Sequence, residues 1–149
     1  VKVMTYGASG SWSDPGPQAT FAWVNRVLDF AQTVVDPGKI AMGVPFFGYD
    51  WSAGGAVRAI TAEQGARLSR AHRAAEGFSR RRDAASGEVV LRYVEAGEAH
   101  VTYYPDARTL AARLDRLRSR HPELGGIAIW VMGQEARGFW STVGTHLRP

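Results

Sequence analysis

The sequence predicts an α/β fold in which strands alternate with helices and a small α+β segment interrupts the alternation. Nearly continuous apolar runs, of the kind found in parallel strands buried on both faces, occur at residues 39–47 and 127–132. A segment with apolar residues at helical spacing precedes each run. Strand, helix and strand with short connections form a βαβ unit, whose crossover we expect to be right-handed.

The first predicted segment, residues 1–57, contains two strand-helix units. Residues 1–6 are predicted to form a strand, and residues 7–17, which are rich in Gly, Ser, Asp and Pro, are predicted to form the loop after it. Thr20 is the predicted N-cap of a helix that ends at the turn of residues 36–38, and the apolar run already described follows. Because the first strand has no polar residues before it, we expect the chain to begin inside a fold.

The second segment, residues 58–104, is predicted to be an inserted α+β subdomain. Thr61 and Gln64 have the spacing of a capping box and begin a helix that we expect to end near Ala75. The strands predicted after it are residues 88–94 and 99–104, joined by a short turn.

The third segment, residues 105–149, returns to the first pattern. It contains a helix at residues 106–120, the strand at residues 127–132 and a last short helix at residues 139–146. The whole chain therefore predicts one α/β domain, or part of one.

Composition excludes several classes of site. No run approaches the roughly 18 apolar residues of a membrane span, and the lack of cysteine excludes disulfides and thiolate zinc sites. The four histidines lack metal-ligand spacing, so we expect no metal site. The net charge of +4 is an ordinary means of staying soluble, with a polyanionic partner as the alternative. The densest basic cluster, Arg80 to Arg82, has no interleaved aromatic residues, so we expect no nucleic-acid partner.

Aromatic and polar side chains follow the ends of all three predicted parallel strands. They are Met4 and Tyr6 in the first, Tyr49, Asp50 and Trp51 in the second, and Trp130 in the third. In a βα barrel the active site lies at the C-terminal ends of the strands. Sugar rings pack on aromatic faces while Tyr and Asp bond to sugar hydroxyls. We therefore expect these residues to converge on one sugar pocket, and the alternative for each ring is core filling.

Three motifs in this order resemble the sixth, seventh and eighth barrel strands of glycoside hydrolase family 18, in its bacterial spore-cortex and cell-wall type. They are Val3-Met4-Thr5-Tyr6, the stretch from Lys39 to Trp51, and the stretch from Gly125 to Trp130. Tyr93, the turn and strand of residues 97–101, and Asp106 to Thr109 are similar to the small subdomain inserted in that family. The resemblance implies the C-terminal part, strands six to eight, of a TIM (β/α)₈ barrel.

The resemblance also implies a chemistry. The family hydrolyses β-1,4-linked N-acetylglucosamine polymers such as peptidoglycan or chitin. A glutamic acid protonates the glycosidic oxygen, and the sugar's own N-acetyl oxygen attacks the anomeric carbon, with no metal or organic cofactor. By motif match, Tyr6 supports the acetamido group, Met4 packs beneath the reacting sugar and Trp130 forms the floor of the site. An extracellular location, at the cell wall or spore envelope, is implied as well.

The sequence departs from this family at the catalytic acid. The signature Asp-x-x-Asp-x-Asp-x-Glu occurs nowhere in residues 1–149, so we expect the acid to lie outside this chain. Gly7 also replaces the aspartate that usually follows the family tyrosine. Two alternatives therefore stay open. One is a non-catalytic glycan-binding module, and the other is a site in which Asp50 and Glu135 supply two carboxylates. A full barrel takes roughly 250 residues, so we expect the isolated chain to dimerise or aggregate through its open edges.

Overall fold

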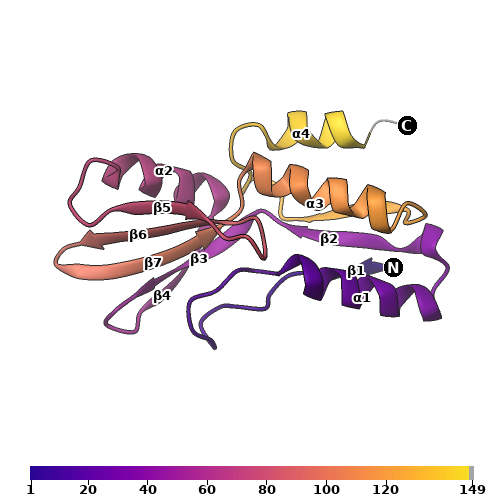
Figure 1. The fold of residues 1–149 in the computed structure, drawn as a ribbon, viewed down its shortest axis with the longest axis horizontal. Coiled ribbons are helices and arrows are strands. Elements are labelled where there is room, and N and C mark those ends of the chain that lie inside the picture. The colour runs from indigo at the N-terminus through magenta and orange to yellow at the C-terminus, as the bar shows by residue number, and fades with distance from the viewer. Residues whose placement is uncertain (148–149) are drawn as a thin grey trace.

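The computed structural model describes residues 1–147 and contains two β-sheets, which lie end to end along the molecule (Figure 1). A three-stranded parallel sheet has the order β1, β2, β8, and a five-stranded antiparallel sheet has the order β4, β3, β7, β6, β5. The strands are β1 (Lys2–Val3), β2 (Ala41–Pro45), β3 (Phe47–Ser52), β4 (Val57–Thr61), β5 (Ser79–Arg82), β6 (Val89–Glu95), β7 (Glu98–Tyr104) and β8 (Gly126–Trp130). The helices are α1 (Phe21–Val34), α2 (Ala62–His72), α3 (Ala107–Arg120) and α4 (Phe139–His146), with a short 3₁₀ helix at Pro37–Lys39. The predicted α/β class is confirmed.

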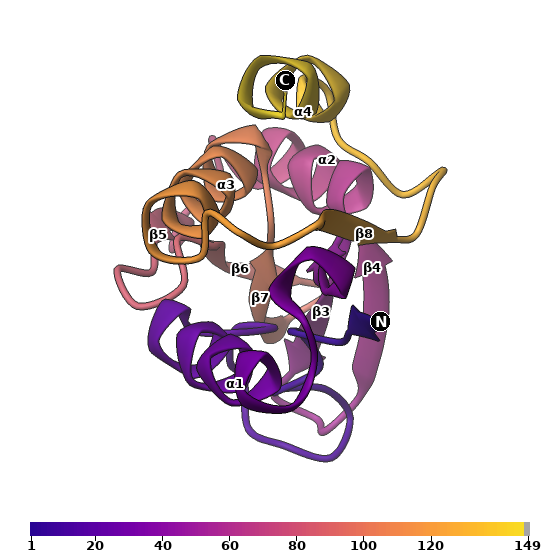
Figure 2. The ribbon, with the colours of Figure 1, turned by 90° about the vertical axis from the view of Figure 1, so that its right-hand side faces the viewer.

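The parallel sheet has helices on one face only. Figure 2 shows α1 and α3 on the same side of the sheet, and α4 packs on the outside of α3. Alternate residues of β2, Met42 and Val44, point into this layer and share a buried core with Leu28 of α1 and Leu114 of α3. Within residues 1–147 no helix covers the opposite face. This half-covered sheet is the setting of the candidate site.

Each of the first three helices begins at a side chain that satisfies a free backbone N–H group. Thr20 accepts a hydrogen bond from the backbone of Trp23, as its predicted N-cap role requires. Thr61 and Gln64 form the predicted capping box at the start of α2. Asp106 begins α3 in the same reciprocal way. These polar residues determine where the helices start, independently of the core.

The second sheet has its own core, under α2. Ile60, Leu91, Tyr93 and Tyr104 are buried there together. Gly65 of α2 permits this packing, since a Cβ atom at that position would overlap the ring of Tyr104. The sheet and α2 therefore form a compact α+β layer beside the parallel sheet (Figure 1).

A buried ion pair joins the two parts of the molecule. Glu88, directly before β6, accepts a hydrogen bond from Arg113 of α3 at 2.7 Å and from the backbone N–H of Gln18 at 3.1 Å. Glu88 is fully buried, and this burial raises its pKa to about 7 against the opposing effect of Arg113. The pair holds α3, the second sheet and the loop before α1 in one arrangement.

The structure differs from the sequence prediction at the boundary between the sheets. We predicted that the inserted subdomain starts at residue 58, but the antiparallel sheet already begins at Phe47. Phe46 is the crossing point, because its N–H donates to Trp130 of the parallel sheet while its C=O accepts from Ala62 of α2. The apolar run is continuous through this point, so its pattern did not reveal the change of sheet.

Other predicted bounds agree or shift by a few residues. The last helix has its predicted range, whereas α2 ends at His72 and not near Ala75. Strand β5 was not predicted, since it consists of the polar run Ser79 to Arg82. The end of the third predicted segment, residues 148–149, lies outside the described residues. None of the helices in residues 1–147 is both long and apolar enough to cross a membrane.

Candidate carbohydrate site at the strand ends

A hollow of about 560 Å³ lies on the helix-free face of the parallel sheet. Small residues line its centre, and the larger Met4, Tyr6 and Trp130 lie around it. Gly43 makes room for the tyrosine, because a Cβ atom there would lie 2.9 Å from Cε1 of Tyr6. Three of the predicted site residues are therefore brought together at this hollow.

The side chains around this hollow are unusually exposed for apolar groups. Met4 is 71% exposed and Trp130 is 57% exposed. An exposed apolar hollow of this kind is covered either by a ligand or by further protein. Partial burial raises the pKa of Tyr6, so its phenol remains protonated and can donate a hydrogen bond. Thr5 holds the strand end in place by donating to the carbonyl of Gly43 at 2.6 Å.

A second hollow, of about 280 Å³, adjoins the first at Trp130. Its other lining residues include Phe47 and Tyr49 of β3, Gln64 of α2 and Gln134 of the loop after β8. Tyr49 was a predicted site residue, and it reaches this hollow from the second sheet. The two hollows share Trp130 and extend from the parallel sheet to the antiparallel sheet, and we refer to them together as the groove.

A row of aromatic rings follows this groove outward. The rings of Tyr6 and Phe47 lie 5.9 Å apart, those of Phe47 and Tyr49 6.0 Å, and those of Tyr49 and Trp12 6.2 Å. Trp12 is 66% exposed and was not predicted as a site residue. The signal that could have found it is a lone tryptophan within a loop of Gly, Ser and Pro residues directly after a candidate strand end.

The structure corrects the predictions for Asp50 and Trp51. Successive side chains of β3 point to opposite faces, so Asp50 faces away from Tyr49. Asp50 is only 3% exposed, and its carboxylate accepts from Tyr93, Thr102 and Arg58 and lies 3.0 Å from Nδ1 of His100. These partners leave no oxygen for a ligand.

Trp51 is buried as well, and its role is to support a loop. Its Nε1–H donates to the carbonyl of Gly10 at 3.2 Å. This bond holds the loop that carries Trp12 against the second sheet. Trp51 therefore positions a neighbour of the groove and does not line it.

Glu135 binds within its own loop. It accepts hydrogen bonds from the backbone of Gly133 at 2.7 Å and from Trp140 at 3.0 Å, and the bond from Trp140 is the main cause of its lowered pKa. Since Asp50 is enclosed in the second sheet, the two carboxylates do not face a shared space. The two-carboxylate hypothesis therefore has no support in this geometry. Among residues 1–147 no group of three or more His, Asp or Glu side chains could hold a metal ion.

The chain is thus an α/β protein whose parallel strand ends place a tryptophan, a tyrosine and a methionine around one open hollow. The sequence profile of glycosyl hydrolases family 18 matches residues 1–135. The chain belongs to glycosyl hydrolase family 18, as the sequence motifs predicted.

The chain is similar to individual members of the family. It is 27% identical over 146 residues to a protein described as uncharacterized glycosylase YvbX, from Bacillus subtilis, covering 96% of this chain and 41% of that protein. It is 28% identical over 139 residues to the cortical fragment-lytic enzyme of the same organism, covering 89% of this chain and 31% of that enzyme.

Solved structures show the same fold. A chitinase from Chromobacterium violaceum matches with a TM-score of 0.86 and 28% identity, over 99% of this chain and 45% of that structure. The Bacillus cereus spore cortex-lytic enzyme SleL matches with a TM-score of 0.87 and 22% identity, over 99% of this chain and 34% of that structure. The chain thus spans less than half the length of these relatives.

Proposed function

We propose that the protein hydrolyses polymers of β-1,4-linked N-acetylglucosamine, such as peptidoglycan or chitin. The observation that supports this most directly is the shared hollow of Met4, Tyr6 and Trp130 on the helix-free face of the parallel sheet. The indole of Trp130 offers a flat apolar floor for the ring of the reacting sugar, and Met4 packs beside it. The phenol of Tyr6 donates a hydrogen bond to the carbonyl oxygen of the sugar's acetamido group.

The proposed reaction is substrate-assisted. A glutamic acid gives its proton to the glycosidic oxygen as the bond to the anomeric carbon breaks, and the N-acetyl oxygen forms a new bond to that carbon. Water then opens this intermediate. Because no Asp-x-x-Asp-x-Asp-x-Glu signature occurs in residues 1–149, we assign the acid to sequence outside this chain. Tyr6 supports the step by holding the acetamido oxygen near the carbon that it attacks.

We further propose that β1, β2 and β8 are strands six to eight of a (β/α)₈ barrel, with the second sheet and α2 as its inserted subdomain. Two facts support this assignment. The chain covers 45% of the chitinase structure that it matches, and within residues 1–147 no strand pairs with the outer edges of β1 and β8. Unpaired parallel edges and a bare apolar face favour association. Light scattering of the isolated chain should therefore show dimers or larger species, and a stable monomer would count against the assignment.

The central test is an assay of hydrolysis on the longest natural protein that contains these residues. Chitin oligosaccharides and purified cortex fragments are the substrates, and released reducing sugar is the measured product. We expect product from at least one substrate, and a Tyr6→Phe variant should bind the same substrate but turn it over more slowly.

A non-catalytic glycan-binding module is the second candidate. The specific observation in its favour is Gly7, which stands beside Tyr6 where the family usually has an aspartate. Binding of oligosaccharide without any released sugar would favour this candidate over hydrolysis. In either case we propose action at the cell wall or spore envelope, in line with the relatives described as cortical fragment-lytic enzymes.

A further inference from the structure

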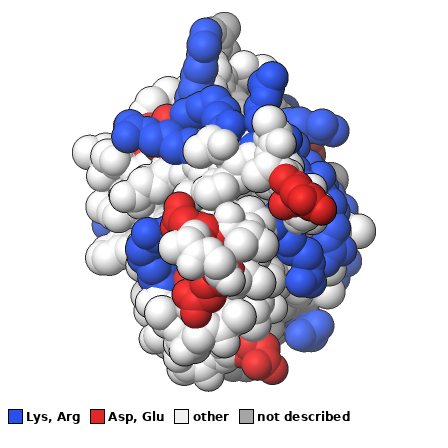
Figure 3. Space-filling view, turned by 90° about the vertical axis from the view of Figure 1, so that its left-hand side faces the viewer, with Lys and Arg blue, Asp and Glu red and all other residues white. Residues whose placement is uncertain are grey.

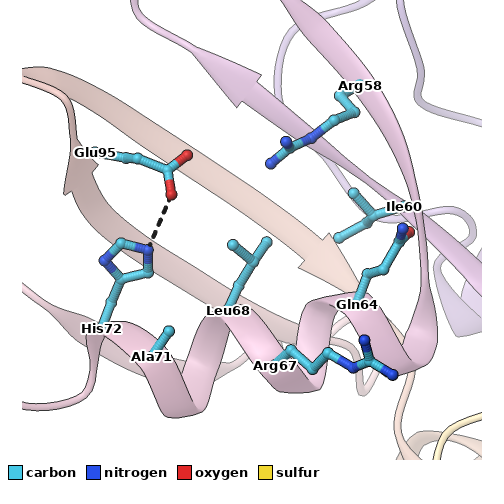
Figure 4. Close-up of a pocket in the computed structure, with 8 residues that line it drawn as sticks. All are labelled: Arg58, Ile60, Gln64, Arg67, Leu68, Ala71, His72 and Glu95. Carbon is cyan, nitrogen blue, oxygen red and sulfur yellow. Dashed lines mark ion pairs between the residues drawn. The ribbon is translucent and has the colours of Figure 1, made fainter.

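A separate pocket of about 260 Å³ lies between α2 and the β4 side of the second sheet (Figure 4). Its floor is apolar and includes Ile60, Leu68 and Ala71. Met4, Tyr6 and Trp130 do not line it. The pocket has Ile60 and Gln64 in common with the hollow beside Trp130, but the two lie on opposite faces of the second sheet, because Arg58 bonds to Asp50 on one face and Tyr49 lines the hollow on the other.

Basic groups lie at one side of this pocket. Arg58 extends from β4 over the space above Leu68, and Arg67 lies along α2 beside Gln64 (Figure 4). Arg58 bonds to Asp50 through one Nη atom at 3.1 Å, and Arg67 bonds to Glu63 through Nε at 3.3 Å. Both side chains are more than half exposed. Each guanidinium therefore keeps further N–H donors that can bind a carboxylate.

The opposite wall is acidic. Glu95, at the end of β6, points into the pocket and lies 3.4 Å from Nε2 of His72 (Figure 4). Its side chain is about half exposed, so an ammonium group can approach it. The surface at this end of the molecule is similarly mixed, with basic and acidic side chains interspersed (Figure 3). The pocket thus offers positive charge at one side, negative charge at the other and an apolar floor between them.

We propose that this pocket binds a short zwitterionic peptide carried as a substituent on the glycan, a proposal that rests on the proposed function. Arg58 and Arg67 bind a peptide carboxylate, Glu95 binds an ammonium group, and the apolar floor contacts the aliphatic chain between them. A substituent on a sugar at Trp130 reaches the pocket around the edge strand β4, past the shared residue Gln64.

The edge of the second sheet supports a peptide as the occupant. Strand β4 lies at the end of the strand order and pairs only with β3 among the described strands. The outer edge of β4 pairs with no described strand, and apart from the N–H of Thr61, which donates to Gln64, its backbone groups can pair with an extended peptide, which is a common mode of peptide recognition. A ligand that used this edge would pass beside Arg58, which is part of β4.

Calorimetric titration of the longest natural protein that contains these residues tests the proposal. The first probe is a disaccharide of N-acetylglucosamine and N-acetylmuramic acid that carries an alanine-glutamate-lysine-alanine peptide. The second is the same disaccharide without peptide, and the third is tetra-N-acetylglucosamine. We expect the first probe to bind more tightly than the second. We expect Arg67→Ala to lower the affinity for the first probe about fivefold and to leave the affinities for the other two probes unchanged.

Two further variants sharpen the test. Arg70→Ala is the matched control, because Arg70 lies on the same helix and bonds to the same Glu63 but does not line the pocket. Glu95→Gln should lower the affinity for the lysine-containing probe. It should leave unchanged the affinity for a probe that has norleucine in place of lysine. Thermal melting of each variant checks that it is folded.

Equal affinity for the first two probes, or equal losses from Arg67→Ala and Arg70→Ala, would overturn the pocket assignment while leaving the proposed function intact. Failure to bind all three probes would instead refute the proposed function, and with it the basis of this proposal.

Discussion

Replacement of Trp130 by alanine is the most direct perturbation of the groove. A fully covered aromatic side chain buries about 150–250 Å², and 57% of Trp130 is exposed at the hollow. A sugar ring covers one face of the indole, so it removes roughly half of that exposed area, about 40–70 Å², from water. At about 25–30 cal/mol per Å² the contact is worth ~1–2 kcal/mol.

This free energy corresponds to a loss of about 5- to 30-fold in affinity. Calorimetry with tetra-N-acetylglucosamine, on the longest natural protein that contains these residues, measures it. Phe30→Ala is the matched control, because Phe30 is a comparably exposed aromatic residue on α1 that lines neither hollow. Unchanged affinity in the Trp130 variant, or an equal loss in the Phe30 variant, would refute the assignment of the hollow as a sugar site.

Three further predictions concern other parts of the structure. Trp12→Ala should lower the affinity for long oligosaccharides by about 3- to 10-fold and leave the affinity for the disaccharide unchanged, because Trp12 lies at the outer end of the aromatic row. Titration with oligosaccharides of increasing length measures this difference. Equal losses of affinity at every length would contradict it. Asp50→Asn should lower the free energy of unfolding by about 2–3 kcal/mol in denaturant titrations, since an amide cannot accept hydrogen bonds from all four partners of the carboxylate. The affinity of this variant for the glycan should stay the same. A loss of affinity without a loss of stability would show that Asp50 binds the ligand. Glu88→Gln should flatten the pH dependence of stability. The pKa of Glu88 is about 7 in the folded protein and near 4.5 in the unfolded chain, so the folded state binds more protons between these values and stability falls as the pH rises through this window, by about 3 kcal/mol. Urea unfolding at several pH values measures the slope, and a slope that persists in the variant would assign it to another group.

Much of the fold follows from local patterns in the sequence. The helical spacing of apolar residues and the caps at Thr20 and Thr61 are short-range features, so α1 and α2 were predicted at their correct starting points and α3 within one residue. Met4, Tyr6 and Trp130 stand at strand ends in a recognisable order, and the structure places all three around one hollow, where a sugar site remains a prediction. Trp12 was missed, since only the folded loop brings it beside Tyr49.

The sequence by itself determined the class of the fold, the family and the residue types available for binding a sugar. Only the tertiary structure decided which side of each strand faces the groove. The apolar run through Phe46 looks the same whether one strand continues or the chain changes sheets, and this choice depends on hydrogen bonds to Trp130 and Ala62, which are distant in sequence. The pleat of β3 then directs Tyr49 to the groove and Asp50 into the interior, because side-chain direction alternates along a strand. Which of the two sets of side chains faces the groove depends on the strands with which β3 pairs.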